Sequence, residues 1–157
     1  MEQSTRKIGV ISDTHGLLRP QAVEALRGVE LILHAGDVGA PEILEDLRKV
    51  APVRAVRGNV DVDPWARRLP GTDLVEIGGV SIYMLHSLAE LDLDPKAGGI
   101  RVVIFGHSHR PEATEKDGVL YLNPGAAGAR RFNLPVSVAR LTIARGIVQH
   151  EHLTLPV

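Results

Sequence analysis

The sequence predicts an α/β fold in which two mixed sheets pack face to face and helices lie on their outer faces. Two observations lead to this prediction. Up to residue 59, three short apolar segments alternate with two segments of helical periodicity, which favours parallel strands joined by helical crossovers. From residue 73 on, paired strand-like segments flank turn dipeptides, which favours antiparallel hairpins. We expect a single domain over residues 1–157, long enough to bury a core.

The first half supplies the alternating elements. Residues 7–12, 31–35 and 53–57 are expected to be strands. A helix is expected to begin at Pro20 and a second one at Pro41, each followed by apolar residues at helical spacing. Proline suits the first turn of a helix because the N–H group that it lacks would have no partner there.

The second half is expected to form hairpins around one buried strand. Residues 60–71 are predicted to be a loop, and the polar segment 87–99 has room for one short helix before a strand at 102–105. Gly78-Gly79, Asp117-Gly118 and Arg145-Gly146 each mark a hairpin turn. The paired strands are 73–77 with 80–85, 114–116 with 119–122, and 137–143 with 147–153.

Composition excludes several classes of function. The net charge of −1, the pI near 6.7 and an aromatic content of 3% provide neither a basic field nor stacking platforms for long nucleic acids. The absence of cysteine excludes disulfides and thiol catalysis. No apolar run is long enough for a membrane span, and residues 1–7 contain no apolar signal region, so we expect a cytoplasmic protein that binds no membrane.

Side chains that bind metals follow the carboxyl ends of five predicted strands. His107 and His109 are two residues apart, so in an extended chain both project to the same side. Loops at the carboxyl ends of strands converge in α/β sheets, so we expect the whole set to lie together. Imidazoles with carboxylates favour Mn, Fe, Co, Ni or Zn over Ca or Mg. The candidate ligands are Asp13, His15, Asp37, Asn59, His86, His107 and His109.

In order, these motifs resemble those of the calcineurin-like metallophosphoesterase superfamily. They are Asp13-Thr14-His15, Gly36-Asp37, Gly58-Asn59, His86 and Gly106-His107-Ser108-His109. The short chain, Gly58-Asn59-Val60-Asp61 and Asn123-Pro124-Gly125 are similar to the small YfcE-type phosphodiesterase branch. The resemblance covers the chain up to about residue 125 and implies a four-layer α/β/β/α sandwich with a two-metal site.

The resemblance also implies a role for each ligand. One ion would be held by Asp13, His15 and His109. The other would be held by Asn59, His86 and His107, with Asp37 bridging both ions. Asp37, Asn59 and His86 would thereby be catalytic, and a hydroxide acidified by two cations would attack phosphorus. The implied cofactors are two divalent metal ions, with Mn²⁺ as the first choice and Ni²⁺, Fe²⁺, Co²⁺ or Zn²⁺ as alternatives.

Two positions depart from the superfamily pattern. His86 lies in Leu85-His86-Ser87, without the glycine that commonly follows this histidine. Val60 stands where a histidine usually follows the Gly-Asn pair, so general-acid help of ~10²–10⁴-fold is expected to be missing. Substrates whose leaving groups have a low pKa should therefore react best.

Several neighbouring residues are candidates for supporting roles. Arg110 adjoins His109 and is the candidate for binding substrate phosphate, with Arg130 and Arg131 as weaker candidates. His34 is expected to orient Asp37 or a loop carbonyl through a hydrogen bond. Asp61 is expected to form a turn or to support the ligands, and Trp65 to anchor its loop. The predictions for His150 and His152 are that both face solvent.

We therefore predict a metal-dependent phosphodiesterase for a small phosphodiester or nucleotide-like substrate, with phosphomonoesters as a further substrate class. The alternative is a non-catalytic scaffold, because the same fold includes the retromer scaffold subunit. The seven intact ligand positions favour the enzyme. The physiological substrate, the native metal and the formation of a homo-oligomer are left open.

Overall fold

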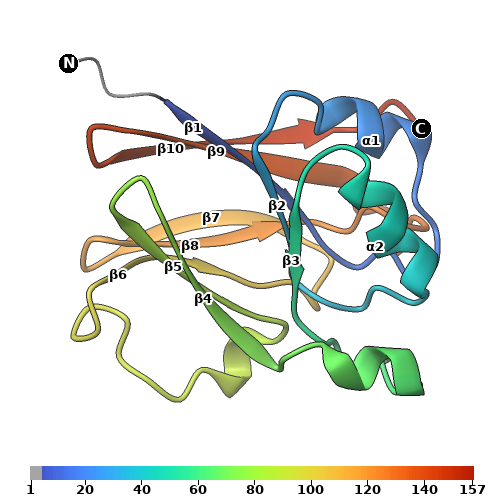
Figure 1. Ribbon diagram of the computed structural model, residues 1–157, viewed down its shortest axis with the longest axis horizontal. Coiled ribbons are helices and arrows are strands. Elements are labelled where there is room, and N and C mark those ends of the chain that lie inside the picture. The colour runs from blue at the N-terminus through green and yellow to red at the C-terminus, as the bar shows by residue number, and fades with distance from the viewer. Residues whose placement is uncertain (1–4) are drawn as a thin grey trace.

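The computed structural model describes residues 5–157 and contains two five-stranded mixed sheets packed against each other (Figure 1). The first sheet has the strand order β10-β9-β1-β2-β3 and the second has the order β4-β5-β6-β8-β7. This arrangement confirms the predicted α/β fold with two mixed sheets. Within the described residues, no helix has the length and apolar character needed to cross a membrane.

The first sheet combines the two ends of the chain. Strands β1 (Arg6–Ile11), β2 (Leu31–His34) and β3 (Val53–Ala55) are parallel. Strand β9 (Ser137–Ala144) runs antiparallel to β1, and β10 (Ile147–Thr154) runs antiparallel to β9. Helices α1 (Pro20–Ala25) and α2 (Pro41–Arg48) form the parallel crossovers, and each begins at the predicted proline.

The second sheet contains the middle of the chain. Strands β5 (Val80–Leu85), β6 (Ile100–Ile104) and β8 (Val119–Pro124) are parallel to one another. Strands β4 (Thr72–Ile77) and β7 (Pro111–Lys116) pair antiparallel at its two edges. The segment 60–71, predicted to be a loop, contains the 3₁₀ helix η1 (Pro64–Arg68). A second 3₁₀ turn, η2 (Leu88–Glu90), follows β5.

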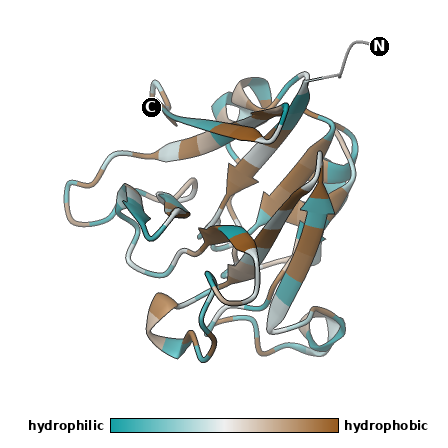
Figure 2. Ribbon diagram, turned by 90° about the vertical axis from the view of Figure 1, so that its left-hand side faces the viewer, coloured by the Kyte–Doolittle hydropathy of each residue, from teal (hydrophilic) through white to brown (hydrophobic). Residues whose placement is uncertain are grey.

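Three apolar clusters hold these layers together. The largest lies between the two sheets and includes Leu33, Ile104 and Leu122, all fully buried. A second cluster joins the outer face of the first sheet to α1 and α2, and a third lies on the outer face of the second sheet against Leu88 and Leu91. Figure 2 shows hydrophobic residues along the strands of both sheets. The fourth layer is therefore thin, since η2 and its loop cover the second sheet.

A buried histidine connects the ends of β1 and β2. His34 has no exposed surface, and its Nδ1 accepts a hydrogen bond from the Gly36 N–H at 3.1 Å. The proton therefore lies on Nε2, which donates to Thr14 Oγ1 at 3.0 Å. Thr14 Oγ1 in turn donates to the Val38 carbonyl. Burial lowers the pKa of His34 to about 4, so the ring is neutral near pH 7.

This burial predicts a loss of stability in acid. Between about pH 6.5 and 4, unfolded His34 binds a proton that the folded protein excludes, so the free energy of unfolding falls as the pH falls. The loss attributable to His34 is on the order of 3 kcal/mol. Chemical denaturation in EDTA across this pH range gives the free energy of unfolding as a function of pH. The contribution of His34 is the difference between the slope for the unsubstituted protein and the slope for His34→Gln.

The comparison with the variant is needed because His15 and His86 have raised pKa values. These two groups make the free energy of unfolding rise as the pH falls, which opposes the effect of His34. The exposed His150 provides a matched control through His150→Gln, which should keep the original slope. An NMR titration in which the ring of His34 protonates near pH 6.5 in the folded protein would contradict the prediction.

Candidate metal centre

The loops that follow five strands meet at one end of the two sheets and bring the predicted ligands together. Asp13 and His15 follow β1, Asp37 follows β2, and Asn59 follows β3. His86 follows β5, whereas His107 and His109 follow β6. Several contacts join the loops of the different sheets. The His107 N–H donates to Asp13 Oδ2 at 3.1 Å, and the His86 Nδ1 lies 2.8 Å from the Ala35 carbonyl oxygen.

The side chains form two adjacent groups. In one group, ligand atoms of Asp13, His15 and His109 lie within 4.8 Å of one another. In the other, the same holds for Asp37, His86 and His107. Asn59 belongs beside the second group, because its Oδ1 lies 3.2 Å from His107 Nδ1.

Asp37 belongs to the second group and also approaches the first. Its Oδ2 is 3.6 Å from His15 Nε2 and 3.2 Å from His86 Nε2. Its Oδ1 accepts a hydrogen bond from the Val60 N–H at 3.0 Å. One carboxylate thus approaches a ligand from each group, which is the position that a residue shared by two ions would need.

Unsatisfied polar atoms indicate that the residues present fit cations. Asp13 is fully buried, yet within residues 5–157 its Oδ1 has no hydrogen-bond partner, and neither have the buried atoms His86 Nε2 and His109 Nδ1. A buried carboxylate oxygen without a partner is costly, and a cation removes that cost. The four imidazoles and two carboxylates of the two groups suit divalent transition metals.

Backbone strain is concentrated in the same loops. Asp13, His15, Asp37, His107 and His109 all have φ values between 46° and 72°, in the left-handed region. Such residues cost about 1–3 kcal/mol each and persist only where the surrounding structure enforces them. The loops also approach closely at two glycines. A Cβ on Gly58 would overlap Asp37, and a Cβ on Gly106 would overlap Ser12.

Electrostatic interactions keep the two carboxylates charged. Burial opposes ionisation of Asp13, but nearby His15 and the Ser12 hydroxyl outweigh it and lower its pKa. Burial likewise opposes ionisation of Asp37, and His86 with the Val60 N–H overcomes it. Conversely, the Asp13 carboxylate raises the pKa of His15. Charged oxygens and imidazole nitrogens therefore face one another, as a metal site requires.

Asp61 supports the ligand loops from behind. Its carboxylate accepts hydrogen bonds from the N–H groups of Val38, Gly39 and Gly58 at 2.8–3.1 Å. It thereby joins the loop that carries Asp37 to the loop that carries Asn59. Of the two roles considered for this residue in the sequence, support of the ligands agrees with these contacts. Trp65 packs against the cluster between the first sheet and its helices, as expected of a residue that anchors its loop.

Asn123 has a supporting role that the sequence reasoning missed. It is fully buried, and its Nδ2 donates to the Gly106 carbonyl and to Ser108 Oγ, so it holds the loop between β6 and His109. An asparagine at the end of a strand, within Asn123-Pro124-Gly125, is the signal that could have identified it. His152, predicted to face solvent, instead lies 2.7 Å from the Asn123 carbonyl oxygen through Nε2, whereas His150 is exposed.

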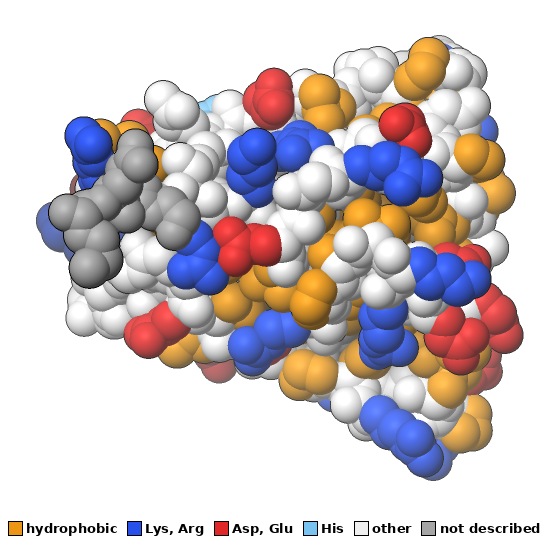
Figure 3. Space-filling view, turned by 45° about the horizontal axis from the view of Figure 1, so that its top comes forward, with side chains coloured by type: hydrophobic (Ala, Val, Ile, Leu, Met, Phe, Trp, Pro, Cys, Tyr) orange, Lys and Arg blue, Asp and Glu red, His pale blue; other side chains and the backbone are white. Residues whose placement is uncertain are grey.

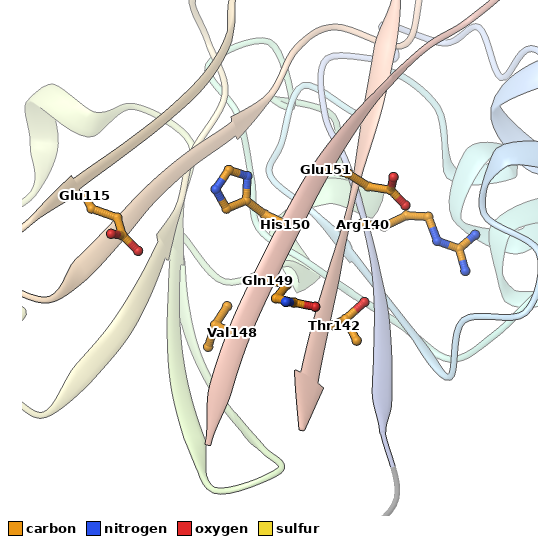
Figure 4. A pocket seen from close by; sticks show the side chains of 7 residues that line it. All are labelled: Glu115, Arg140, Thr142, Val148, Gln149, His150 and Glu151. Carbon is orange, nitrogen blue, oxygen red and sulfur yellow. The ribbon is translucent and has the colours of Figure 1, made fainter. Parts of the chain in front are cut away.

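The seven ligand candidates do not line the hollow between the edge strands β7 and β10. That hollow is about 620 Å³ and is lined mainly by polar side chains such as Glu115, Arg140 and His150 (Figure 4). It is open to solvent. Arg110, predicted to bind phosphate, is exposed, and its backbone N–H bonds to Ser108 Oγ. Its role stays a prediction.

Known proteins share both the sequence and the fold. A protein named probable metallophosphoesterase from Methanothermobacter thermautotrophicus is 39% identical over 150 residues, which cover 85% of each chain. An archaeal phosphodiesterase of known structure has a TM-score of 0.78 at 26% identity, over 94% of this chain and 99% of that one. Vacuolar Protein Sorting 29 from Cryptosporidium parvum has the same TM-score at 21% identity, over 97% and 100%, which shows a common fold.

A family model extends this similarity over most of the sequence. The model for the calcineurin-like phosphoesterase superfamily domain matches residues 7–146, a range that contains all seven candidate ligands. The chain therefore belongs to the calcineurin-like phosphoesterase superfamily.

Proposed function

We propose that this protein is a phosphodiesterase that depends on two divalent metal ions. The observation that carries the proposal is the position of the Asp37 carboxylate. Its Oδ2 lies 3.6 Å from His15 Nε2 in the first group of candidate ligands and 3.2 Å from His86 Nε2 in its own group. The similar metallophosphoesterase and the archaeal phosphodiesterase support the reaction class. Phosphomonoesters are a further substrate class for the same site.

Each ligand has a specific part in this proposal. Asp13, His15 and His109 would hold one ion, and Asn59, His86 and His107 would hold the other. Asp37 would be shared by both. When bound, the two ions would acidify a water molecule and neutralise charge on the phosphoryl oxygens. Mn²⁺ is our first choice for these nitrogen and oxygen ligands, and Ni²⁺, Fe²⁺, Co²⁺ and Zn²⁺ are alternatives.

The exposure of the candidate ligands indicates from which side a phosphate would approach. Asn59 and His107 are exposed and His15 is half-buried, whereas Asp13 and His109 are buried, so substrate would approach from the side on which Asn59, His15 and His107 reach solvent. Val60 is 44% exposed beside Asn59 and has no acidic proton to donate. The leaving group would therefore depart without a proton from this position.

Surface charge supports a small substrate. On the face shown in Figure 3, basic and acidic side chains are interspersed with apolar ones. A net charge of −1 also provides no field to follow a long polyanion.

A non-catalytic scaffold is the second candidate, because Vacuolar Protein Sorting 29 has the same fold. That likeness concerns the fold alone. The buried, unsatisfied Asp13 Oδ1 favours metal binding and hence the enzyme.

The first prediction from the proposed function concerns hydrolysis of an activated phosphodiester. With Mn²⁺ or Ni²⁺, the protein should release p-nitrophenol from bis(p-nitrophenyl) phosphate, and EDTA should abolish this activity. Asp37→Ala should reduce the rate by more than the 10- to 100-fold typical of outer partners of a metal site. Asp117→Asn, on the exposed turn between β7 and β8, is the matched control and should be fully active. Protein that binds a stable partner, contains no measurable metal and cleaves neither diesters nor monoesters would favour the scaffold.

A second prediction concerns Asp61. In Asp61→Asn, one carboxylate oxygen becomes an NH₂ group that faces a backbone N–H donor instead of accepting from it. Metal affinity should fall by roughly 10- to 100-fold while the fold is retained. Titration calorimetry with Mn²⁺ and circular dichroism measure the two effects. Unchanged affinity would show that the ligand loops do not need this support.

A third prediction concerns Val60. Because no general acid is available there, rates across a series of aryl diesters should fall steeply as the pKa of the leaving group rises. Val60→His should make this dependence shallower, by accelerating poor leaving groups more than good ones. A rate that is independent of leaving-group pKa in the unsubstituted protein would indicate that another residue supplies the proton.

A further inference from the structure

The loop between β8 and β9 is fastened to the loop that carries Asp13. The Ala127 N–H donates to the Ser12 carbonyl at 3.0 Å, and the Gly128 N–H donates to the Asp13 carbonyl at 3.3 Å. The Arg19 side chain holds the Gly128 carbonyl from the other side at 3.1 Å. Residues 129–133 therefore extend into solvent from a loop base that is hydrogen-bonded to the backbone of Asp13, a candidate ligand.

The tip of this loop presents an aromatic ring in an unfavourable conformation. The Leu134 N–H donates to the Arg131 carbonyl and closes a tight turn, in which Phe132 (φ 53°) and Asn133 (φ 59°) are both left-handed. Asparagine tolerates this conformation, but phenylalanine does not favour it. The Phe132 side chain is also 83% exposed, so packing does not explain its presence. A strained and solvated aromatic residue points to a ligand.

The two arginines before Phe132 differ in their surroundings. The Arg130 guanidinium donates to the Val157 carbonyl oxygen. The Arg131 guanidinium has no hydrogen bond or ion pair with any part of residues 5–157. Arg131 follows Gly128 by three residues, and the Gly128 N–H is bonded to the Asp13 carbonyl, so the chain brings this free guanidinium close to the ligand group of Asp13.

We propose that Arg131 and Phe132 form a substrate-recognition element for small phosphodiesters that carry a nucleoside. The guanidinium would bind phosphoryl oxygens next to the ligand group of Asp13, His15 and His109, since its planar donors match a phosphate. The exposed ring of Phe132, one residue further out, would stack on the base. A single ring suits one base and not a polymer. The proposal rests on the proposed phosphodiesterase function and names its substrate class.

The test compares two diesters with the same leaving group. Methyl p-nitrophenyl phosphate and thymidine 5′-(p-nitrophenyl phosphate) both release p-nitrophenolate, so their ratio of kcat/KM reports recognition of the nucleoside. We expect the unsubstituted protein to prefer the thymidine diester. Phe132→Ala should reduce that preference by roughly 5- to 100-fold with little change for the methyl diester. Phe132→Trp should retain it.

The arginine is tested with an exposed arginine outside the site as control. Arg131→Gln should raise KM for both diesters, because both contain the phosphate. Arg145→Gln, on the exposed turn between β9 and β10, removes the same charge and should leave both unchanged. Calorimetry with thymidine 5′-monophosphate on the manganese-loaded protein provides a readout that does not depend on turnover. Its affinity should fall in Phe132→Ala and in Arg131→Gln.

A structural explanation of any loss is tested by Phe132→Asn, which fits the left-handed conformation better. It should melt at the same or a higher temperature and still lose the nucleoside preference. Equal ratios of kcat/KM in Phe132→Ala and the unsubstituted protein, or equal effects of Arg145→Gln and Arg131→Gln, would overturn the inference while cleavage of the methyl diester upheld the proposed function. Cleavage of neither diester would overturn both.

Discussion

Asp13 is the residue on which the arrangement of the centre depends. Its N–H bonds to the Gly36 carbonyl, its Oδ2 accepts from Ser12 Oγ and the His107 N–H, and its carbonyl accepts from the Gly128 N–H. One buried residue therefore joins the loop after β1 to the loops after β2, β6 and β8. Because β1 and β6 belong to different sheets, these contacts also set the position of one sheet's loops against the other's.

The other carboxylate oxygen of Asp13, Oδ1, links the stability of this end of the molecule to metal binding. A fully buried carboxylate with an unpartnered Oδ1 destabilises the fold on its own, and five strained ligand conformations add to that cost. The fold tolerates this loss of stability because the two sheets bury large apolar clusters on both of their faces. Cations bound between Asp13 and Asp37 would recover part of it, so metal binding and local order at this end of the molecule should be coupled.

Local signals allowed the strands, and the meeting of the candidate ligands beyond their ends, to be predicted. The hydrophobic periodicity and the turn dipeptides predict β5, β8 and their hairpins. Candidate ligands such as Asp37 and His86 lie directly after strands, where chain topology alone brings them together. What could not be predicted depends on contacts between distant segments. The hydrogen bonds of Asn123 to the β6 loop and of His152 to Asn123 link residues 15 to 29 positions apart. The 3₁₀ helix η1 forms where Trp65 packs against a cluster assembled from both ends of the chain.

The proposed source of reactivity and the proposed source of specificity differ in how firmly they are held. The candidate ligands follow the ends of strands, and their loops are held by buried groups such as His34, Asp61 and Asn123, so their positions tolerate little change. The loop that carries Arg131 and Phe132 is fixed at its base, where a Cβ on Gly128 would collide with Thr14, yet its tip contacts solvent. Substitutions at the tip can therefore alter the preferred substrate without moving Asp13, whereas substitutions at Gly128 would displace both the loop and the ligand to which it is bonded.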